Sequence, residues 1–68
     1  MSDWKRVYET AQEYRAHIVK AFLEDRGIRA MVINKQDRPY LLGFHEVHVP
    51  TEQLLGALHL INEYIDFE

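Results

Sequence analysis

One short stretch of this chain, residues 22–34, constrains its fold more than any other. A helical pattern of apolar residues stops at Gly27, and a strand-like run begins at Ile28. Glycine tolerates the left-handed backbone that closes many helices, so Gly27 is predicted to be the residue just after a helix end. The junction therefore predicts a helix that passes into a strand with almost no loop.

The segment before that helix is predicted to be a strand over residues 4–9, because it is rich in aromatic and β-branched side chains. Side chains alternate along a strand, which places Trp4, Arg6 and Tyr8 on one face and the intervening residues on the other. Thr10 and Glu13 have the spacing of a capping box, in which both side chains bind free backbone amides. The helix is therefore expected to begin at Thr10 and to run to about Arg26.

Two further elements follow the glycine junction and its strand, which we predict over residues 28–34. A segment over 34–44 separates it from a short third strand at about 45–49, and Pro50 ends that strand because proline cannot continue a central ladder. The final helix starts after Pro50 and carries an apolar stripe at helical spacing. The residues of that stripe are Leu54, Leu58, Ile61 and Ile65, flanked by Ala57, Leu60 and Tyr64.

Size and charge limit what such a chain can do. Its 68 residues form one domain with one small core, and 47% of them are apolar, which favours a folded protein over a disordered one. Cysteine is absent, which removes disulfides and thiolate metal sites, so oligomerisation is the expected additional source of stability. A net charge of −3 disfavours nucleic acid as a partner, and the apolar runs are too short for a membrane span. We expect a cytoplasmic protein.

The element order β-α-β-β-α predicts the architecture. A right-handed β-α-β crossover puts both helices on one face, and the third strand fits antiparallel between the first two. The expected fold is an α+β two-layer sandwich with sheet order 1-3-2, a ferredoxin-like fold that lacks its last strand.

This truncation leaves one sheet face without cover from the chain itself. If Val7, Ile28, Ala30 and Val32 face the helices, that open face displays an aromatic and aliphatic patch, which is typical of an interface core. The predicted oligomer face consists of Trp4, Tyr8, Met31 and Ile33.

The order and spacing of these segments resemble a family of small prokaryotic domains labelled as signal-transducing proteins. The resemblance rests on the strand that begins at Trp4, on the helix from Ala16 through Gly27 and Ile28, and on residues 32–34 followed by Asp37. It continues through residues 42–43 and 46–50. It implies a fold related to the PII-type (GlnB-like) nitrogen regulators, with a long loop after the second strand. The chain shows no nucleotide-binding motif, so no cofactor is expected.

The segment over 34–44 is the predicted contact region for a protein or small ligand. Its polar members Asn34, Asp37 and Arg38 either bind a ligand or shape turns, as Asn and Asp commonly do, and turn formation is the favoured interpretation. Its apolar members either pack under the helices or contact a partner. The candidate loop residues are Asn34, Asp37, Arg38, Tyr40, Leu42, Gly43 and Phe44.

Two histidines flank an acidic residue in the third strand. Alternation puts Glu46 and His48 on one face and His45 on the other, so one compact metal site within a copy is disfavoured and no metal is expected. The favoured function is a non-enzymatic regulatory or interaction module that forms a homo-oligomer, with a dimer as the simplest case. The alternative is a metal-dependent or acid/base enzyme built across a dimer interface from His45, Glu46, His48 and Asp37.

Overall fold

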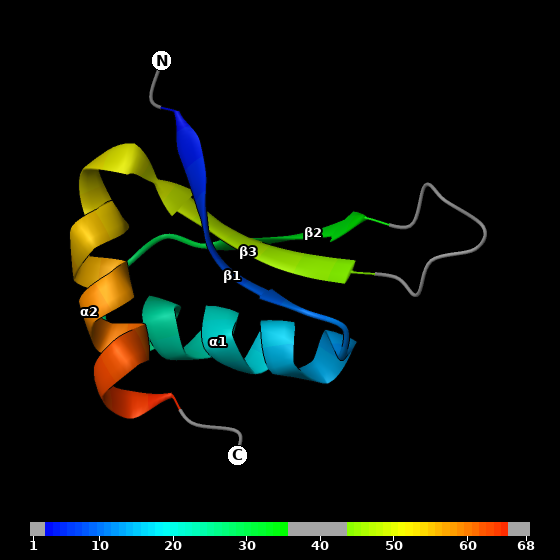
Figure 1. The fold of residues 1–68 in the computed structure, drawn as a ribbon. Coiled ribbons are helices and arrows are strands. Elements are labelled where there is room, and N and C mark those ends of the chain that lie inside the picture. The colour runs from blue at the N-terminus through cyan, green and yellow to red at the C-terminus, as the bar shows by residue number, and fades with distance from the viewer. Residues whose placement is uncertain (1–2, 36–43, 66–68) are drawn as a thin grey trace.

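The computed structural model describes residues 3–35 and 44–65, and it confirms the predicted order of elements (Figure 1). The three strands are β1 (Trp4–Thr10), β2 (Met31–Lys35) and β3 (Phe44–Pro50). The helices are α1 (Glu13–Asp25) and α2 (Leu54–Tyr64), and a single turn of 3-10 helix, η1 (Thr51–Gln53), leads into α2.

The sheet has the predicted strand order, β1-β3-β2, and β3 pairs antiparallel with both of its neighbours. Strands β1 and β2 are therefore parallel to each other, as a β-α-β crossover requires. Both helices contribute to one core on the same side of the sheet, with α2 crossing the end of α1 (Figure 1). This is the expected α+β two-layer arrangement, compatible with a ferredoxin-like fold without its last strand.

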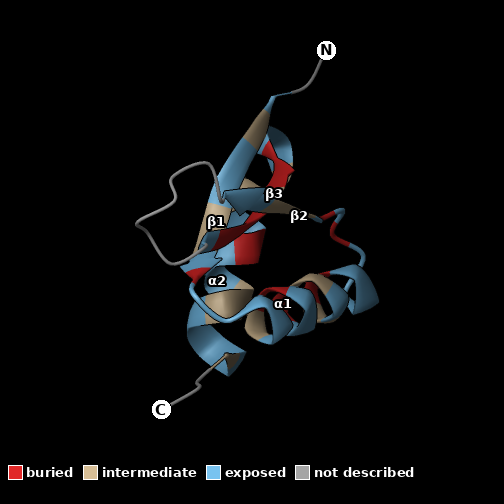
Figure 2. Ribbon diagram, turned by 90° about the vertical axis from the view of Figure 1, so that its right-hand side faces the viewer, coloured by how far each residue is buried: buried red, intermediate tan, exposed pale blue. Residues whose placement is uncertain are grey.

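A small core lies between the helices and β3 (Figure 2). In the apolar stripe of α2, Ala57 is the residue that is fully buried. Leu58 and Tyr64, expected on or beside that stripe, are instead 42% and 61% exposed. The buried core residues are Ala16, Val19, Leu23, Ile28, Ala30, Val47, Val49 and Ala57.

The glycine junction has the predicted geometry. Gly27 has a φ of 83°, its amide donates to the Glu24 carbonyl, and the Ile28 amide donates to the Leu23 carbonyl, both at 3.0 Å. These two bonds form a Schellman motif, which satisfies carbonyls that the helix end would otherwise leave free. Leu23 and Ile28 also meet in the core, so the motif fixes the exit of the chain from α1.

The start of α1 differs from the prediction, and the capping box is wrong. Thr10 is the last residue of β1 and pairs with His45 in the ladder, so it cannot also be the helix cap. Its hydroxyl accepts a hydrogen bond from the Gln12 amide at 3.1 Å and closes the turn before the helix. Gln12 takes the cap position without a side-chain capping bond, and α1 begins at Glu13.

Strand β2 begins three residues later than predicted, at Met31. The side chain of Gln53, in η1, makes hydrogen bonds with the backbone between α1 and β2. The Arg29 amide donates to Gln53 Oε1 at 3.0 Å, and Gln53 Nε2 donates to the Gly27 carbonyl at 3.4 Å. These bonds replace ladder bonds over the residues that follow the glycine. The junction is consequently a helix end, a short segment tied to η1, and then a strand.

A β-bulge in β1 corrects the predicted faces of that strand. Arg6 pairs with His48, but Tyr8 pairs with Val47, so one extra residue lies in β1 between these pairs. A bulge changes the alternation beyond it. As a result Val7 and Tyr8 both pack against the core, and Tyr8 lies on the helix side instead of the open face.

Candidate functional site on the open face of the sheet

The face of the sheet opposite the helices carries side chains from all three strands. Because Val47 and Val49 are fully buried in the core, Glu46 and His48 of β3 point to the opposite, open face. The register with β2 and β1 then assigns the remaining members of this face. They are Trp4, Arg6, Glu9, Met31, Ile33, Lys35 and Phe44.

Glu46 is the centre of a network of charged side chains, which we call the Glu46 network. It is only 7% exposed, although no helix covers this face. Its Oε1 lies 2.9 Å from His48 Nε2 and 3.9 Å from Lys35 Nζ, and its Oε2 accepts a hydrogen bond from Arg6 Nη1 at 3.3 Å. Arg6 also lies 3.6 Å from Glu9. The carboxylate is thus covered by its own ion-pair partners.

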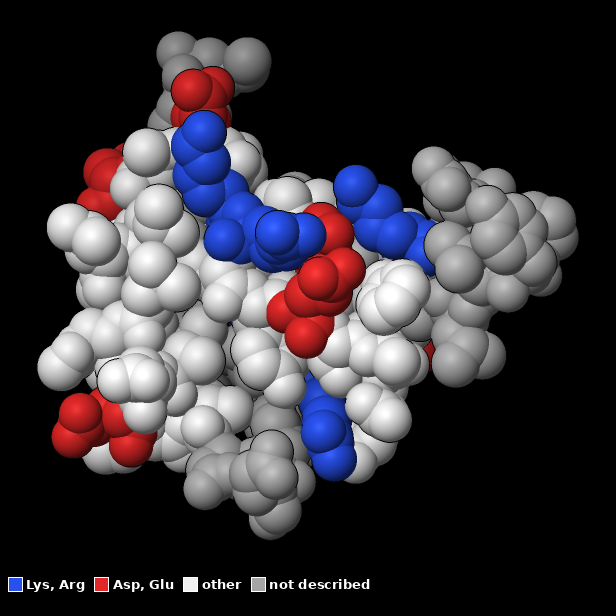
Figure 3. All heavy atoms as spheres, in the orientation of Figure 1, with Lys and Arg blue, Asp and Glu red and all other residues white. Residues whose placement is uncertain are grey.

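The bulge in β1 is what brings Arg6 and Glu9 to the same face. In a regular strand, residues three apart point to opposite sides, whereas here the extra residue restores a common direction. Basic and acidic side chains meet near the middle of the face seen in Figure 3. A local irregularity of β1 therefore completes the network from its side of the sheet.

The network lowers the pKa of the Glu46 carboxyl below its usual value. The hydrogen bond with His48 is the largest cause, and the charges of Lys35 and Arg6, with the hydrogen bond from Arg6, act in the same direction. Burial opposes them, because desolvation disfavours the charged form. Glu46 is accordingly a paired carboxylate, unlike the raised-pKa carboxyl of a general acid.

The two histidines of β3 are separated by the sheet, as alternation predicted. His45 is buried on the helix side, where its Nδ1 lies 2.6 Å from Oδ1 of Asn34. His48 is on the open face with Glu46. Asp37, the fourth member of the alternative enzyme site, lies outside the described residues.

Within residues 3–35 and 44–65, the structure has no cluster of three or more His, Asp or Glu side chains arranged to hold a metal ion. The same part of the chain has no pocket.

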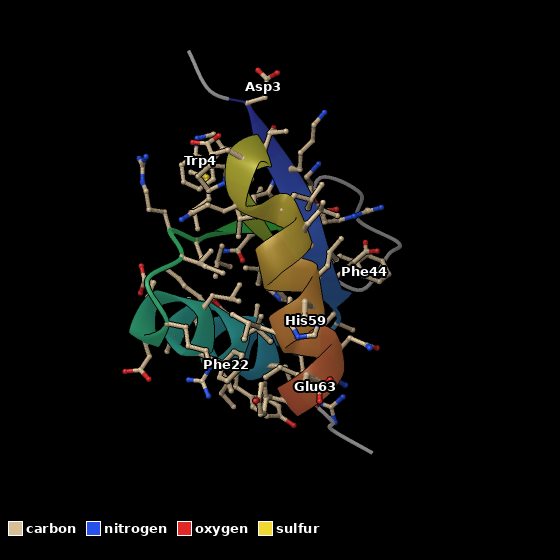
Figure 4. The ribbon with its side chains drawn as sticks, turned by 90° about the vertical axis from the view of Figure 1, so that its left-hand side faces the viewer. Asp3, Trp4, Phe22, Phe44, His59 and Glu63 are labelled. Carbon is tan, nitrogen blue, oxygen red and sulfur yellow. The ribbon has the colours of Figure 1, made fainter. Side chains whose placement is uncertain are left out.

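Three of the four residues of the predicted oligomer face lie on the open face. Met31 is 39% exposed, and Ile33 and Trp4 are partly exposed. Trp4 and Phe44 lie near opposite ends of the β1-β3-β2 ladder, and Figure 4 shows them well apart. Tyr8, on the helix side, is not part of this surface.

The predicted contact loop is described only at its two ends. Asn34 is in β2 and Phe44 is in β3, where it is 37% exposed. The other candidate residues, Asp37, Arg38, Tyr40, Leu42 and Gly43, lie outside the described residues.

Alternation along β1 correctly placed Arg6 on the same face as Trp4, but sequence reasoning did not identify Glu9 and Lys35 as part of this face. For Lys35 a usable signal existed in β3. Alternation puts the Glu46 carboxylate on one face of the sheet, and a cationic side chain from a neighbouring strand is expected beside it. No such signal existed for Glu9, since its position depends on the bulge.

The fold and this surface define a class: a small α+β module with a three-stranded sheet, one face covered by helices and the other open. A family model described as "Putative prokaryotic signal transducing protein" matches residues 4–65. The chain belongs to this family, in agreement with the resemblance found in its sequence.

No significant match was found among curated proteins or solved structures. Neither helix in the described part of the chain has the length and apolar character needed to cross a bilayer.

Proposed function

We propose that this protein is a small non-enzymatic signal-transducing module that acts by association, and that a second copy binds to the open face of the sheet. The proposal is supported by one observation above all: Met31 and Ile33 stay accessible beside the Glu46 network, whose charges are already paired within one copy. Charges that are paired beforehand cost less to bring to an interface than unpaired ones. The proposed compartment is the cytoplasm, where a chain without cysteine would be suited.

The size of the chain supports association as well. A domain of 68 residues buries a small core, and homo-oligomers are a common way to gain further burial. The partner of a symmetric dimer uses the same patch, so each copy would contribute Met31 and Ile33 to the contact.

The test is sedimentation equilibrium over a concentration series, with two matched variants. Met31→Gln removes an apolar side chain from the open face, and Leu55→Gln removes one from α2, where Leu55 is 81% exposed. Fully burying an exposed Met side chain is worth about 1.5–3 kcal/mol. Met31 is 39% exposed, and a symmetric dimer would bury this remaining part in both copies, so Met31→Gln should weaken the dimer by about tenfold. Leu55→Gln should leave the dimer unchanged. A monomer at high micromolar concentration, or equal weakening by both variants, would contradict the proposal.

Binding of a protein or small ligand by the 34–44 segment is a separate part of the proposal and rests on its sequence. Replacing Tyr40 and Phe44 by Ala should remove a partner that co-purifies with the protein from its native cell, while the far-UV circular dichroism stays unchanged. An unchanged set of partners would contradict this part alone.

The enzyme alternative has less support. Its residues His45 and Glu46 lie on opposite faces of β3, so a single site would have to form between different surfaces of two copies. Stoichiometric zinc, iron or manganese that is lost in a His48→Ala variant would favour it.

A further inference from the structure

The two edges of the sheet differ in their capacity to accept another strand. Strand β1 contains the bulge between Arg6 and Tyr8. The residue just before β1, Asp3, is bound to η1, because its carbonyl accepts a hydrogen bond from the Thr51 amide at 2.8 Å. A bulge is one feature that protects an edge from pairing. Strand β2 has neither a bulge nor a proline, and it pairs with β3 residue for residue from Met31 to Lys35.

The outer edge of β2 is free within the described part of the chain. Strand β2 is the last strand of the sheet, on the side away from β1 (Figure 2). Among the described residues, its backbone makes no hydrogen bond to backbone outside the β2–β3 ladder. A regular edge of this kind offers a row of donors and acceptors to an extended peptide.

The side chains of β2 suit an extended peptide that is apolar at alternate positions. Met31 and Ile33 lie next to each other on the open face, two residues apart, and both have accessible surface. An added strand places every second side chain on this same face, beside them.

The charge of this edge specifies the partner further. Residues 28–35 contain two cations, Arg29 and Lys35, and no acidic residue, in a chain whose net charge is −3. Both cationic groups lie over the open face beside this edge. Lys35 Nζ is 3.9 Å from Glu46 and its side chain is 54% exposed, and the Arg29 guanidinium is 5.4 Å from the ring centroid of Trp4, with Arg29 also exposed. A second copy paired through β2 would add two more cations to this edge. An acidic peptide would complement them.

We propose that the β2 edge binds an extended, acidic peptide segment of a partner protein by strand addition. The inference rests on the proposed function only in taking the protein to be a module that has a partner, and it assigns that partner to the β2 edge, which adjoins the open face at Met31 and Ile33. Backbone hydrogen bonds from β2 hold the peptide, Met31 and Ile33 contact its alternate side chains, and Lys35 with Arg29 attracts its carboxylates.

The experiment uses the full chain and a random-peptide display library. The selected peptides should be rich in Asp and Glu and should carry apolar residues at alternate positions. In NMR spectra of the labelled protein, a selected peptide should shift the amides of residues 31–35 and slow their hydrogen exchange. A version of the same peptide with proline at its centre should not bind, because proline interrupts the ladder.

Charge reversal provides the matched variants. Lys35→Glu should weaken binding of the acidic peptide by about fivefold or more, and added salt should weaken it too. Lys5→Glu makes the same change of charge on β1, the other edge, and should have little effect. The inference would be overturned if no peptide is selected, or if the selected peptides carry no excess of Asp and Glu. It would also be overturned if the amide shifts are confined to β1 or the helices, or if Lys5→Glu and Lys35→Glu weaken binding equally. Self-association of the chain alone, measured by sedimentation, tests the proposed function separately.

Discussion

At the scale of single residues, Glu46 is the side chain that most defines the open face. A carboxylate in the middle strand of a sheet without cover would normally be solvated, yet here it is almost fully enclosed by His48, Arg6 and Lys35. Arg and Lys side chains have long aliphatic parts that can cover apolar surface, and the charged groups of Arg6 and Lys35 contact the carboxylate at 3.3 and 3.9 Å. The network therefore covers the centre of the face that the truncated fold leaves open.

Replacing Glu46 by Gln should destabilise the protein. The amide keeps the shape and some hydrogen bonding, but it leaves Arg6, Lys35 and His48 without the negative charge they share. Because Arg6 and Lys35 are half exposed, the loss should be moderate, about 1–2 kcal/mol in urea unfolding at neutral pH. The control is Glu9→Gln, at the exposed margin of the network, which should cost less than about 0.5 kcal/mol. Equal effects of the two substitutions would contradict a central role for Glu46.

The same carboxylate should make stability depend on pH. The pKa of Glu46 is lower in the folded protein than in the unfolded chain. Its contribution is therefore fully present above the unfolded pKa of an ordinary Glu, about 4.3, and is lost as the pH falls through the folded pKa. Unfolding curves should show the difference between wild type and Glu46→Gln shrinking as the pH is lowered below about 4.3. A difference that grows in acid would show that the sign of the pKa shift is wrong.

At the scale of elements, two glycines have opposite roles. Gly27 has a φ of 83°, where an L-residue is strained, and a Cβ there would meet no other atom within 4 Å. Gly56 lies inside α2, and its added Cβ would reach only Ile28 Cδ1 at 4.0 Å, an ordinary contact. Close packing therefore does not require a glycine at position 56.

Alanine substitutions should separate these roles. Gly27→Ala should destabilise the protein by about 1–2 kcal/mol, the cost of a left-handed conformation for a residue with a Cβ. Gly56→Ala should stabilise it by up to about 1 kcal/mol, because alanine is the better helix former. Thermal or urea unfolding of both variants measures the effect. A loss of stability in Gly56→Ala would reveal packing tighter than the structure has.

A cation also links the two helices. The guanidinium of Arg26 lies 4.2 Å from the ring centroid of Phe22 in α1 and 5.2 Å from that of Tyr64 in α2, and the two rings are 6.0 Å apart. Figure 4 shows Phe22 beside the lower part of α2. Aromatic and cation–π contacts therefore hold the C-terminal end of α2 against the C-terminal end of α1.

Removing this cation should loosen the end of α2. Arg26→Gln should cost about 0.5–1 kcal/mol, the usual value of an exposed cation–π contact, and should speed amide exchange in the last turn of α2. Lys20→Gln is the matched control, because Lys20 pairs only with Glu24 at 3.1 Å among the interactions found for it. Unchanged exchange in α2 on loss of Arg26 would contradict the link.

The elements that were predicted correctly depend on local signals, and those that were not depend on tertiary contacts. The helix end at Gly27 and the faces of β3 follow from backbone preference and alternation alone. The predicted start of α1 was wrong because Thr10 pairs with His45 in the β1–β3 ladder. The predicted start of β2 was wrong because Gln53, more than twenty residues away in sequence, accepts a hydrogen bond from the Arg29 amide. The predicted face of Tyr8 was wrong because the residue pattern of β1 contains no signal for the bulge.

At the scale of the whole molecule, a single layer of helices leaves the sheet with two different surfaces that no other element covers within residues 3–35 and 44–65. The open face combines a paired charge network with Met31 and Ile33, and the β2 edge combines regular backbone with two cations. We propose the first surface as the site for a second copy and the second as the site for an extended peptide, so association is the activity that we propose for this architecture. This agrees with a family described as signal transducing.

The central claim, that the open face is the association surface, is tested most directly by NMR of labelled methyl groups over a dilution series. We expect the methyl signals of Met31 and Ile33 to change with protein concentration, while those of Leu55 and Leu58 on α2 stay constant. Concentration-dependent changes confined to α2, or none at any site up to high micromolar concentration, would contradict it.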